Sequence, residues 1–166
     1  MEQGRPLQAE NLKSSMSQPP TKPTLWLFLH GVARWQRGAA PAHALEREHA
    51  ALLAWLWLEG PTPRSCLAGL LWPEVAEERA RGNLRQRLFK LRADGGDLVQ
   101  GANGVLSLAA DAQVQPLDPP AAELLAAQAF DDCDTLARWL DSRRQVERER
   151  RKRKWLAEER EAAQGQ

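Results

Sequence analysis

Residues 77–108, EERARGNLRQRLFKLRADGGDLVQGANGVLSL, contain the pattern that decides the fold. In the first half of this stretch, apolar side chains recur at the spacing of an α-helix and fall on one face. That face consists of Ala80, Leu84, Leu88 and Leu91. Two alternating apolar runs follow, on either side of a turn rich in Gly and Asn. The stretch therefore predicts a helix over residues 77–92 and, directly after it, a β-hairpin over residues 98–108.

Two further helices are predicted upstream of this stretch. Apolar residues recur at helical spacing from Glu46 until a turn of Gly and Pro at residues 60–63. A second, short helix fits Arg64–Leu71. Pro73 ends it, because a proline disfavours the helical conformation of the residue before it. The helix over residues 77–92 is thus the third of three helices that are close in sequence.

Short extended segments are predicted before the first helix. Two apolar runs, Leu25–Leu29 and Val32–Trp35, are separated at Gly31, which is typical of a hairpin or meander. A further short extended segment fits Ala42–Leu45. The order is then strands, three helices and a hairpin. This order predicts an α+β fold, a winged helix-turn-helix with a small N-terminal sheet and the C-terminal hairpin as its wing.

The remainder of the chain is predicted to be divided into segments of different character. From the N-terminus onward these are a disordered arm over residues 1–23, a winged-helix domain over residues 24–117 and a helical extension over residues 118–166. Residues 109–120 are expected to form a linker with one short strand around Val114. A short helix is predicted over residues 121–129, and a long, highly charged helix over residues 131–163.

Three local signatures resemble the DNA-binding domain of the SARP/AfsR-type bacterial transcriptional regulators. They are Leu71-Trp72-Pro73-Glu74, the Asn-Leu-Arg-Gln core within Arg79–Arg92, and the hairpin. The similarity covers about residues 24–117. Those regulators carry an OmpR-type winged helix followed by an all-helical bacterial transcriptional activation domain (BTAD). Residues 130–140 and the charged run behind them look like the opening helix of that domain, and we expect the chain to hold only this part of it.

The resemblance implies a transcriptional regulator, an activator by analogy with the family. Such a protein binds double-stranded DNA, usually as a homodimer on repeated half-sites, and then contacts RNA polymerase. In OmpR-type activators the loop before the third helix is a surface touched by the polymerase. In this sequence the resemblance assigns that contact to Glu74 and Val75. Trp72, in the same loop, is expected to pack on the core.

The third predicted helix carries side chains suited to reading DNA. Asn83 and Gln86 can bond adenine edges, whereas Arg79 and Lys90 can reach guanine or phosphate. Three flanking arginines suit the phosphates, which provide affinity more than sequence choice. The complete set of expected DNA contacts is Arg79, Arg81, Asn83, Arg85, Gln86, Arg87 and Lys90. The hairpin tip at residues 101–104 has no Lys or Arg, so no reading of the minor groove is expected from it.

Other features of the sequence point away from an enzyme, a metalloprotein or a membrane protein. Cys66 and Cys133 are far apart, and none of the three histidines has the spacing of a metal ligand. Phosphate-binding loops and the GxSxG turn are absent from the sequence, so neither a cofactor nor catalysis is expected. The sequence also shows no secretory signal and no apolar stretch long enough for a membrane span. We expect a cytoplasmic, nucleoid-associated bacterial protein.

Two alternatives stay open at the level of sequence. The basic run Arg148–Lys154 could tether DNA phosphates, although the glutamates around it favour a solvated helix. The winged helix could also have lost its DNA-reading role. The long helix over residues 131–163 would then be the working part of a protein-interaction adaptor, or of an antagonist of a fuller regulator.

Overall fold

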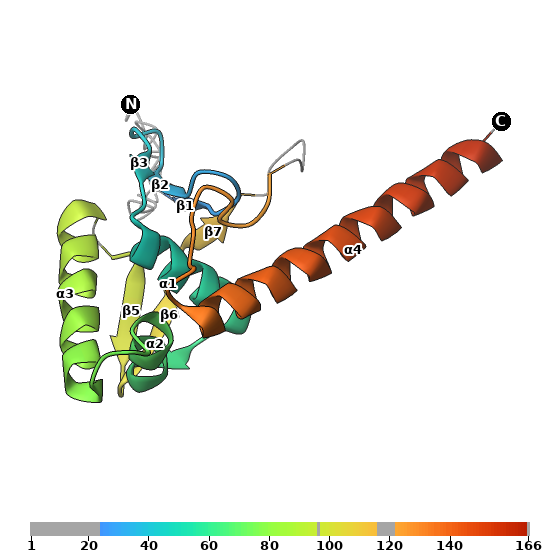
Figure 1. The fold of residues 1–166 in the computed structure, drawn as a ribbon. Coiled ribbons are helices and arrows are strands. Elements are labelled where there is room, and N and C mark those ends of the chain that lie inside the picture. The colour runs from blue at the N-terminus through green and yellow to red at the C-terminus, as the bar shows by residue number, and fades with distance from the viewer. Residues whose placement is uncertain (1–23, 96, 116–121, 166) are drawn as a thin grey trace, which may run out of the picture.

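The computed structural model describes residues 24–95, 97–115 and 122–165, which form an α+β fold (Figure 1). The helices of these residues are α1 (Arg47–Glu59), α2 (Arg64–Leu71), α3 (Glu77–Gly95) and α4 (Asp134–Gln164). The strands are β1 (Leu25–Phe28), β2 (Arg34–Arg37), β3 (His43–Ala44), β4 (Thr62–Pro63), β5 (Val99–Ala102), β6 (Val105–Leu108) and β7 (Ala112–Val114). The arm expected over residues 1–23 and part of the expected linker, residues 116–120, lie outside the described residues.

The first sheet has the strand order β3-β2-β1-β7. β1 and β2 pair antiparallel, with Leu27 opposite Trp35, and the bend between them contains Gly31 at a φ of 72°, a conformation that favours glycine. β2 begins later than the predicted apolar run because Val32 lies in this bend and is 58% exposed. β7 runs parallel to β1, which confirms the strand predicted around Val114.

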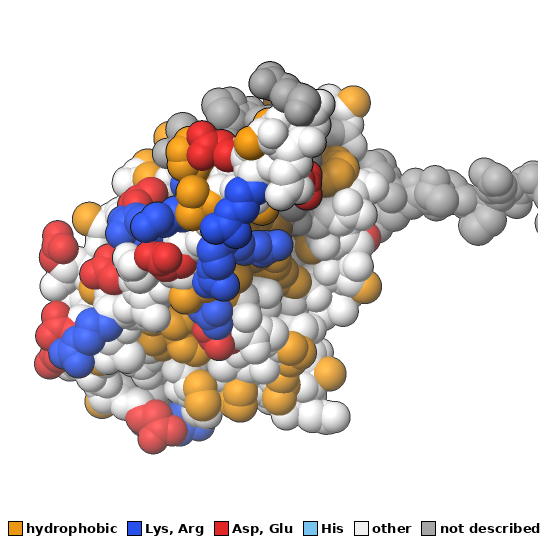
Figure 2. Space-filling view, turned by 90° about the vertical axis from the view of Figure 1, so that its right-hand side faces the viewer, with side chains coloured by type: hydrophobic (Ala, Val, Ile, Leu, Met, Phe, Trp, Pro, Cys, Tyr) orange, Lys and Arg blue, Asp and Glu red, His pale blue; other side chains and the backbone are white. Residues whose placement is uncertain are grey.

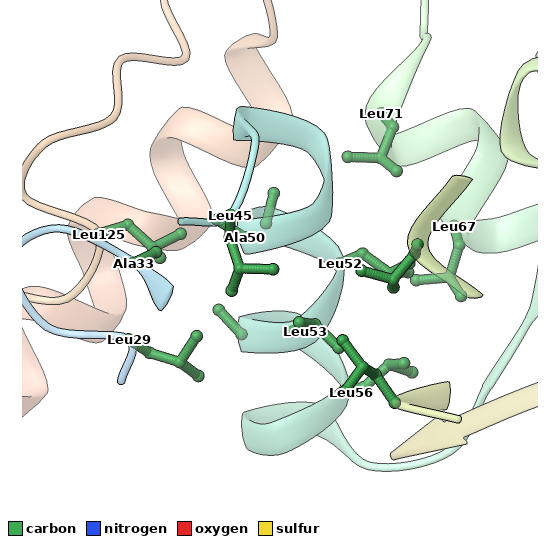
Figure 3. Close-up of a cluster of buried hydrophobic side chains, with 14 of the residues drawn as sticks. Leu29, Ala33, Leu45, Ala50, Leu52, Leu53, Leu56, Leu67, Leu71 and Leu125 are labelled. Atoms are coloured by element: carbon green, nitrogen blue, oxygen red, sulfur yellow. The ribbon is translucent and has the colours of Figure 1, made fainter. Parts of the chain in front are cut away.

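α1 lies at the centre of the hydrophobic core (Figure 3). Alternate residues of β1 point into this core, and Leu29 just beyond the strand lies on the same side of α1 as Leu125. On the other side, Leu52 of α1 lies near Leu67 of α2 (Figure 3). Each of these four leucines is 1% exposed or less. Full burial of a leucine side chain contributes about 1.5–3 kcal/mol to the free energy of folding. Because buried leucines pack on two sides of α1, the other elements assemble around this helix.

The hairpin of β5 and β6 closes through a tight turn at Asn103 and Gly104. Both residues have positive φ, 53° and 76°, as a two-residue hairpin turn of the Asn-Gly kind requires. Thr62 and Pro63 pair with β6 as an additional short strand, giving the sheet order β4-β6-β5. The residues predicted only to end the first helix therefore also fix the hairpin beside α2.

The short helix predicted over residues 121–129 is wrong for the described part of that segment. Residues 122–129 form a bridge and turns, and Leu125 has a φ of 49°, outside the helical range. Besides short turn bonds, this segment forms backbone hydrogen bonds with the residues after β1: Leu125 N donates to Leu29 O, and Gly31 N donates to Glu123 O. Tertiary pairing has replaced the local helical hydrogen bonds that the composition favoured.

α4 divides into two parts that differ in their surroundings. Its first turns pack into the same core as the other helices, with Leu136 and Leu140 buried. The C-terminal part extends away from the body of the molecule (Figure 1), and every residue from Lys152 to Gln164 is exposed. In the described part of the chain, no helix has the length and apolar character needed to cross a membrane.

Candidate nucleic-acid interface

α3 lies at one edge of the molecule with its outer side uncovered (Figure 1). Ala80, Leu84 and Leu91 are buried against the core, and Leu88 packs partly against it, as the apolar spacing predicted. The helix starts at the predicted residue and continues three residues further than predicted, to Gly95. A Cβ at Gly95 would lie 2.6 Å from Cε2 of Trp35, so the absence of a side chain there allows the ring to pack against the end of α3.

Four of the seven expected DNA contacts line one hollow along α3. The hollow has a volume of about 390 Å³ and is bounded by Trp72 together with Asn83, Gln86, Arg87 and Lys90. Gln86 and Lys90 are exposed, and Asn83 is half-buried. Trp72 packs partly against the core, as expected from sequence. The amide groups and the cations on this side of α3 therefore face one concave surface.

The cationic side chains of this hollow are held by a carboxylate from the residue before α1. Arg87 Nη1 donates to Glu46 Oε2 at 2.9 Å, and Lys90 Nζ donates to Glu46 Oε1. The hydrogen bond from Lys90 lowers the pKa of Glu46, so this carboxyl stays charged. His49 in turn hydrogen-bonds the backbone oxygen of Arg87 at 2.9 Å. The hollow is preorganised by these contacts, and two of its expected DNA contacts already have an internal partner.

The remaining expected contacts lie away from this hollow. Arg81 and Arg85 project, by helical periodicity, from the side of α3 nearer the hairpin. Arg81 forms an ion pair of 3.1 Å with Glu77 of the same helix. Arg79 and Arg85 are exposed and make no ion pair within the described residues. The seven residues thus do not form one patch, because they occupy two sides of one helix.

Two arginines that sequence reasoning did not assign stand beside the hairpin. Arg92 of α3 and Arg64 of α2 line a small cleft of about 20 Å³ together with Gly101 of β5. An Nη atom of Arg64 would lie 2.9 Å from a Cβ at Gly101, so the glycine leaves room for the guanidinium. The hairpin tip has no basic residue of its own, but α2 and α3 supply two beside it, and Arg64 N donates to Gly104 O of the turn. The sequence held no signal for Arg64, because its position depends on the pairing of β4 with β6.

The outermost line of α3 carries Gly82 and Phe89, two turns apart. A Cβ at Gly82 would meet nothing within 4 Å, so no packing within the described residues requires a glycine there. Phe89 is 74% exposed, the highest value among the large hydrophobic residues that the structure describes. Helical periodicity alone places Phe89 opposite the buried leucines, and this signal was available in the sequence. A flat apolar ring at this position can pack against thymine methyl groups or against another protein.

The loop between α2 and α3 presents the residues that the family resemblance assigned to RNA polymerase. Glu74 is exposed and Val75 is half-buried. Val75 N donates to Trp72 O at 3.3 Å, which closes a turn around the proline between them. This loop borders the hollow through Trp72, so Glu74 lies on the surface next to the face of α3 that carries Asn83.

This surface has no metal site among the described residues, and the comparisons with known proteins give no further information about it. Among the residues that the structure describes, no three His, Cys, Asp or Glu side chains are grouped as they would be to hold a metal ion. Comparison of the chain with protein-family models, curated proteins and solved structures found no match.

Proposed function

We propose that this chain is a sequence-specific, double-stranded DNA-binding transcriptional regulator that reads the major groove with α3. The observation that carries the proposal is α3 itself, a helix with an uncovered outer side, with amides and two cations on one flank and further arginines on the other. A helix of this kind fits the width of the major groove of B-DNA. Asn83 and Gln86 are the base-reading candidates, and Arg79, Arg81 and Arg85 the candidates for phosphate contacts.

The arrangement of the elements supports an OmpR-type winged helix-turn-helix as the finer description of the fold. A small sheet precedes three helices, and a hairpin follows the third helix directly. Arg64 and Arg92 beside the hairpin extend the cationic side of α3 toward the wing. Cations in this place can contact DNA phosphates even though the wing tip itself carries no basic residue.

Activation of transcription requires a contact beyond DNA, and we place it at the loop after α2. Glu74 and Val75 lie there, directly before α3 in the chain. A protomer seated on its site near a promoter in the bacterial cytoplasm would thus present this loop to RNA polymerase. Occupation of repeated half-sites by two protomers is part of the same proposal.

Selection of bound sequences from a pool of random duplex DNA tests the proposal. The unmodified chain should enrich one motif, in repeated copies if two protomers bind together. Asn83→Ala with Gln86→Ala should relax the motif with a loss of about 1–3 kcal/mol for each lost base contact. A suitable control is Gln145→Ala with Gln128→Ala, which removes amides outside α3. Binding without any enriched motif would contradict the proposal, and absence of binding at low salt would favour the protein-interaction adaptor instead.

A further inference from the structure

The projecting end of α4 carries a regular stripe of exposed side chains. The stripe consists of residues at intervals of three and four, which lie on one face of a helix. These residues are Lys152, Trp155, Glu159 and Ala162. Leu156 and Ala163 border the same face. Trp155 is 57% exposed and Leu156 is 38% exposed, although both are large apolar residues. Exposed apolar residues placed together on a projecting helix mark an interaction surface.

The charges of this stripe change sign at its apolar centre. Six of the seven residues from Arg148 to Lys154 are basic, whereas three of the four residues from Glu158 to Glu161 are acidic. Lys152 and Glu159 are separated by about 10 Å along the helix axis, too far for a direct ion pair. Neither makes an ion pair with another described residue, unlike Lys154 and Glu158, which pair at 3.8 Å.

We propose that this end of α4 pairs with the same segment of a second copy of the chain, in antiparallel orientation. A two-fold axis between Trp155 and Leu156 brings each Trp155 against the partner's Leu156. The same axis sets Lys152 of each copy opposite Glu159 of the other. The basic half of each stripe therefore faces the acidic half of the other stripe. A surface that is complementary to itself in this way is what a two-fold interface requires.

The small residues at the end of α4 fit the same register. Ala163 falls opposite Arg148 of the other copy, and an alanine there leaves room beside the body of the molecule. Arg148 is already held by the body, since its Nε donates to Glu123 Oε1 at 2.6 Å. The pairing therefore begins where α4 leaves the body. It leaves α3 uncovered, because α3 lies at the opposite side of the molecule (Figure 1).

The surface seen from the projecting end of α4 agrees with a mixed-charge contact. Figure 2 shows Lys and Arg side chains gathered on this face, with Asp and Glu side chains beside them and hydrophobic side chains among them. A groove for DNA phosphates would be uniformly basic. The mixture of signs favours a protein surface that also carries both signs, and α4 itself provides one.

Sedimentation of the full chain without DNA, over a range of concentrations, tests the proposal. A reducing agent must be present, because Cys66 is exposed. The unmodified chain should pass from monomer to dimer as concentration rises. Lys152→Glu and Glu159→Lys should each weaken this dimer by about tenfold or more, since each places two like-charged pairs opposite each other. An equimolar mixture of the two variants should restore the dimer, because all facing charges are then opposite.

Trp155→Ala should weaken the dimer as well, whereas Val146→Ala should leave it unchanged. Val146 is a matched control, since it is 55% exposed but lies on the other side of α4. A monomer at every concentration would overturn the proposal. A dimer that both charge reversals leave intact would overturn the antiparallel register and move the interface elsewhere. Neither result bears on DNA binding by α3, which the sequence selection tests separately.

Discussion

α3 and α4 are both rich in arginine, yet their charges are used in different ways. α3 carries six basic and three acidic residues, and Arg79 and Arg85 make no ion pair within the described part of the chain. In α4 most of the basic residues near the body are already paired: Arg143 with Glu59, Arg148 with Glu123 and Arg151 with Glu147. A high content of basic residues does not by itself make a DNA-binding helix. The setting of the cations without an internal partner separates the two helices: those of α3 lie on the uncovered side of a helix packed on the core, whereas those of α4 stand among glutamates on its projecting part.

The two helices also differ in their dependence on the core. Leu84 of α3 is 2% exposed, whereas Leu156 of α4 is 38% exposed. Leu84→Ala should lower the free energy of unfolding by about 2–5 kcal/mol, because it leaves a cavity among buried side chains. Leu156→Ala should change it by less than about 0.5 kcal/mol. Chemical denaturation of the monomer measures both, and equal losses would show that the end of α4 is packed after all.

A substitution at Gly82 of α3 should change the free energy of unfolding and the DNA affinity in opposite directions. Gly82→Ala should raise the free energy of unfolding by up to about 1 kcal/mol, because a Cβ there meets nothing. If α3 enters the groove, the same change should weaken DNA binding. Gly69→Ala in α2 is the matched control, since a Cβ there also meets nothing within 4 Å and the residue lies outside α3. Unchanged DNA affinity in Gly82→Ala would move the DNA contact away from this line of the helix.

Glu46 forms ion pairs with two of the cations of α3, Arg87 and Lys90. Glu46→Gln removes the carboxylate that binds Arg87 and Lys90. We expect this change to strengthen DNA binding by about two- to fivefold, because both cations then become available to phosphates without breaking an ion pair. Titration of labelled duplex DNA measures the effect. Weaker binding would mean that Glu46 serves mainly to orient these side chains.

The attachment of α4 to the body should be sensitive to acid. Glu59 accepts hydrogen bonds from Trp139 at 2.7 Å and from Arg143, and these lower the pKa of Glu59. A carboxyl whose pKa is lowered in the folded state stabilises it above its ordinary pKa of about 4, and this contribution is lost as the pH falls through the lowered value. Glu59→Gln should therefore be less stable than the unmodified chain at pH 7, with the difference shrinking toward pH 3. Urea denaturation across this range checks the trend.

The sequence predicted the helices around the core better than the segments that join them. α2 has the predicted bounds and α3 the predicted start, because prolines and apolar spacing act locally. The helix predicted before α4 was wrong, since Leu125 N donates its hydrogen bond to Leu29 O after β1, which is distant in sequence. Such long-range backbone pairing leaves no local pattern to read.

Prediction of the candidate site was uneven for related reasons. Helical spacing alone separated the buried leucines of α3 from its polar residues. It could not reveal that Glu46 holds Arg87 and Lys90, because this contact joins α3 to the start of α1. Arg64 was missed for the same reason, while Phe89 was within reach of the periodicity argument. Contacts between elements, more than the composition of any one element, determine which charges remain available.

Salt dependence of DNA binding by two matched double variants tests the central claim most directly. Arg85→Ala with Arg92→Ala removes two exposed arginines from α3, and Arg150→Ala with Arg153→Ala removes two from α4. The slope of log affinity against log salt should fall in magnitude by about 2 for the α3 pair, one for each lost phosphate contact, and stay unchanged for the α4 pair. A lower slope for the α4 pair with an unchanged slope for the α3 pair would contradict the assignment of DNA binding to α3.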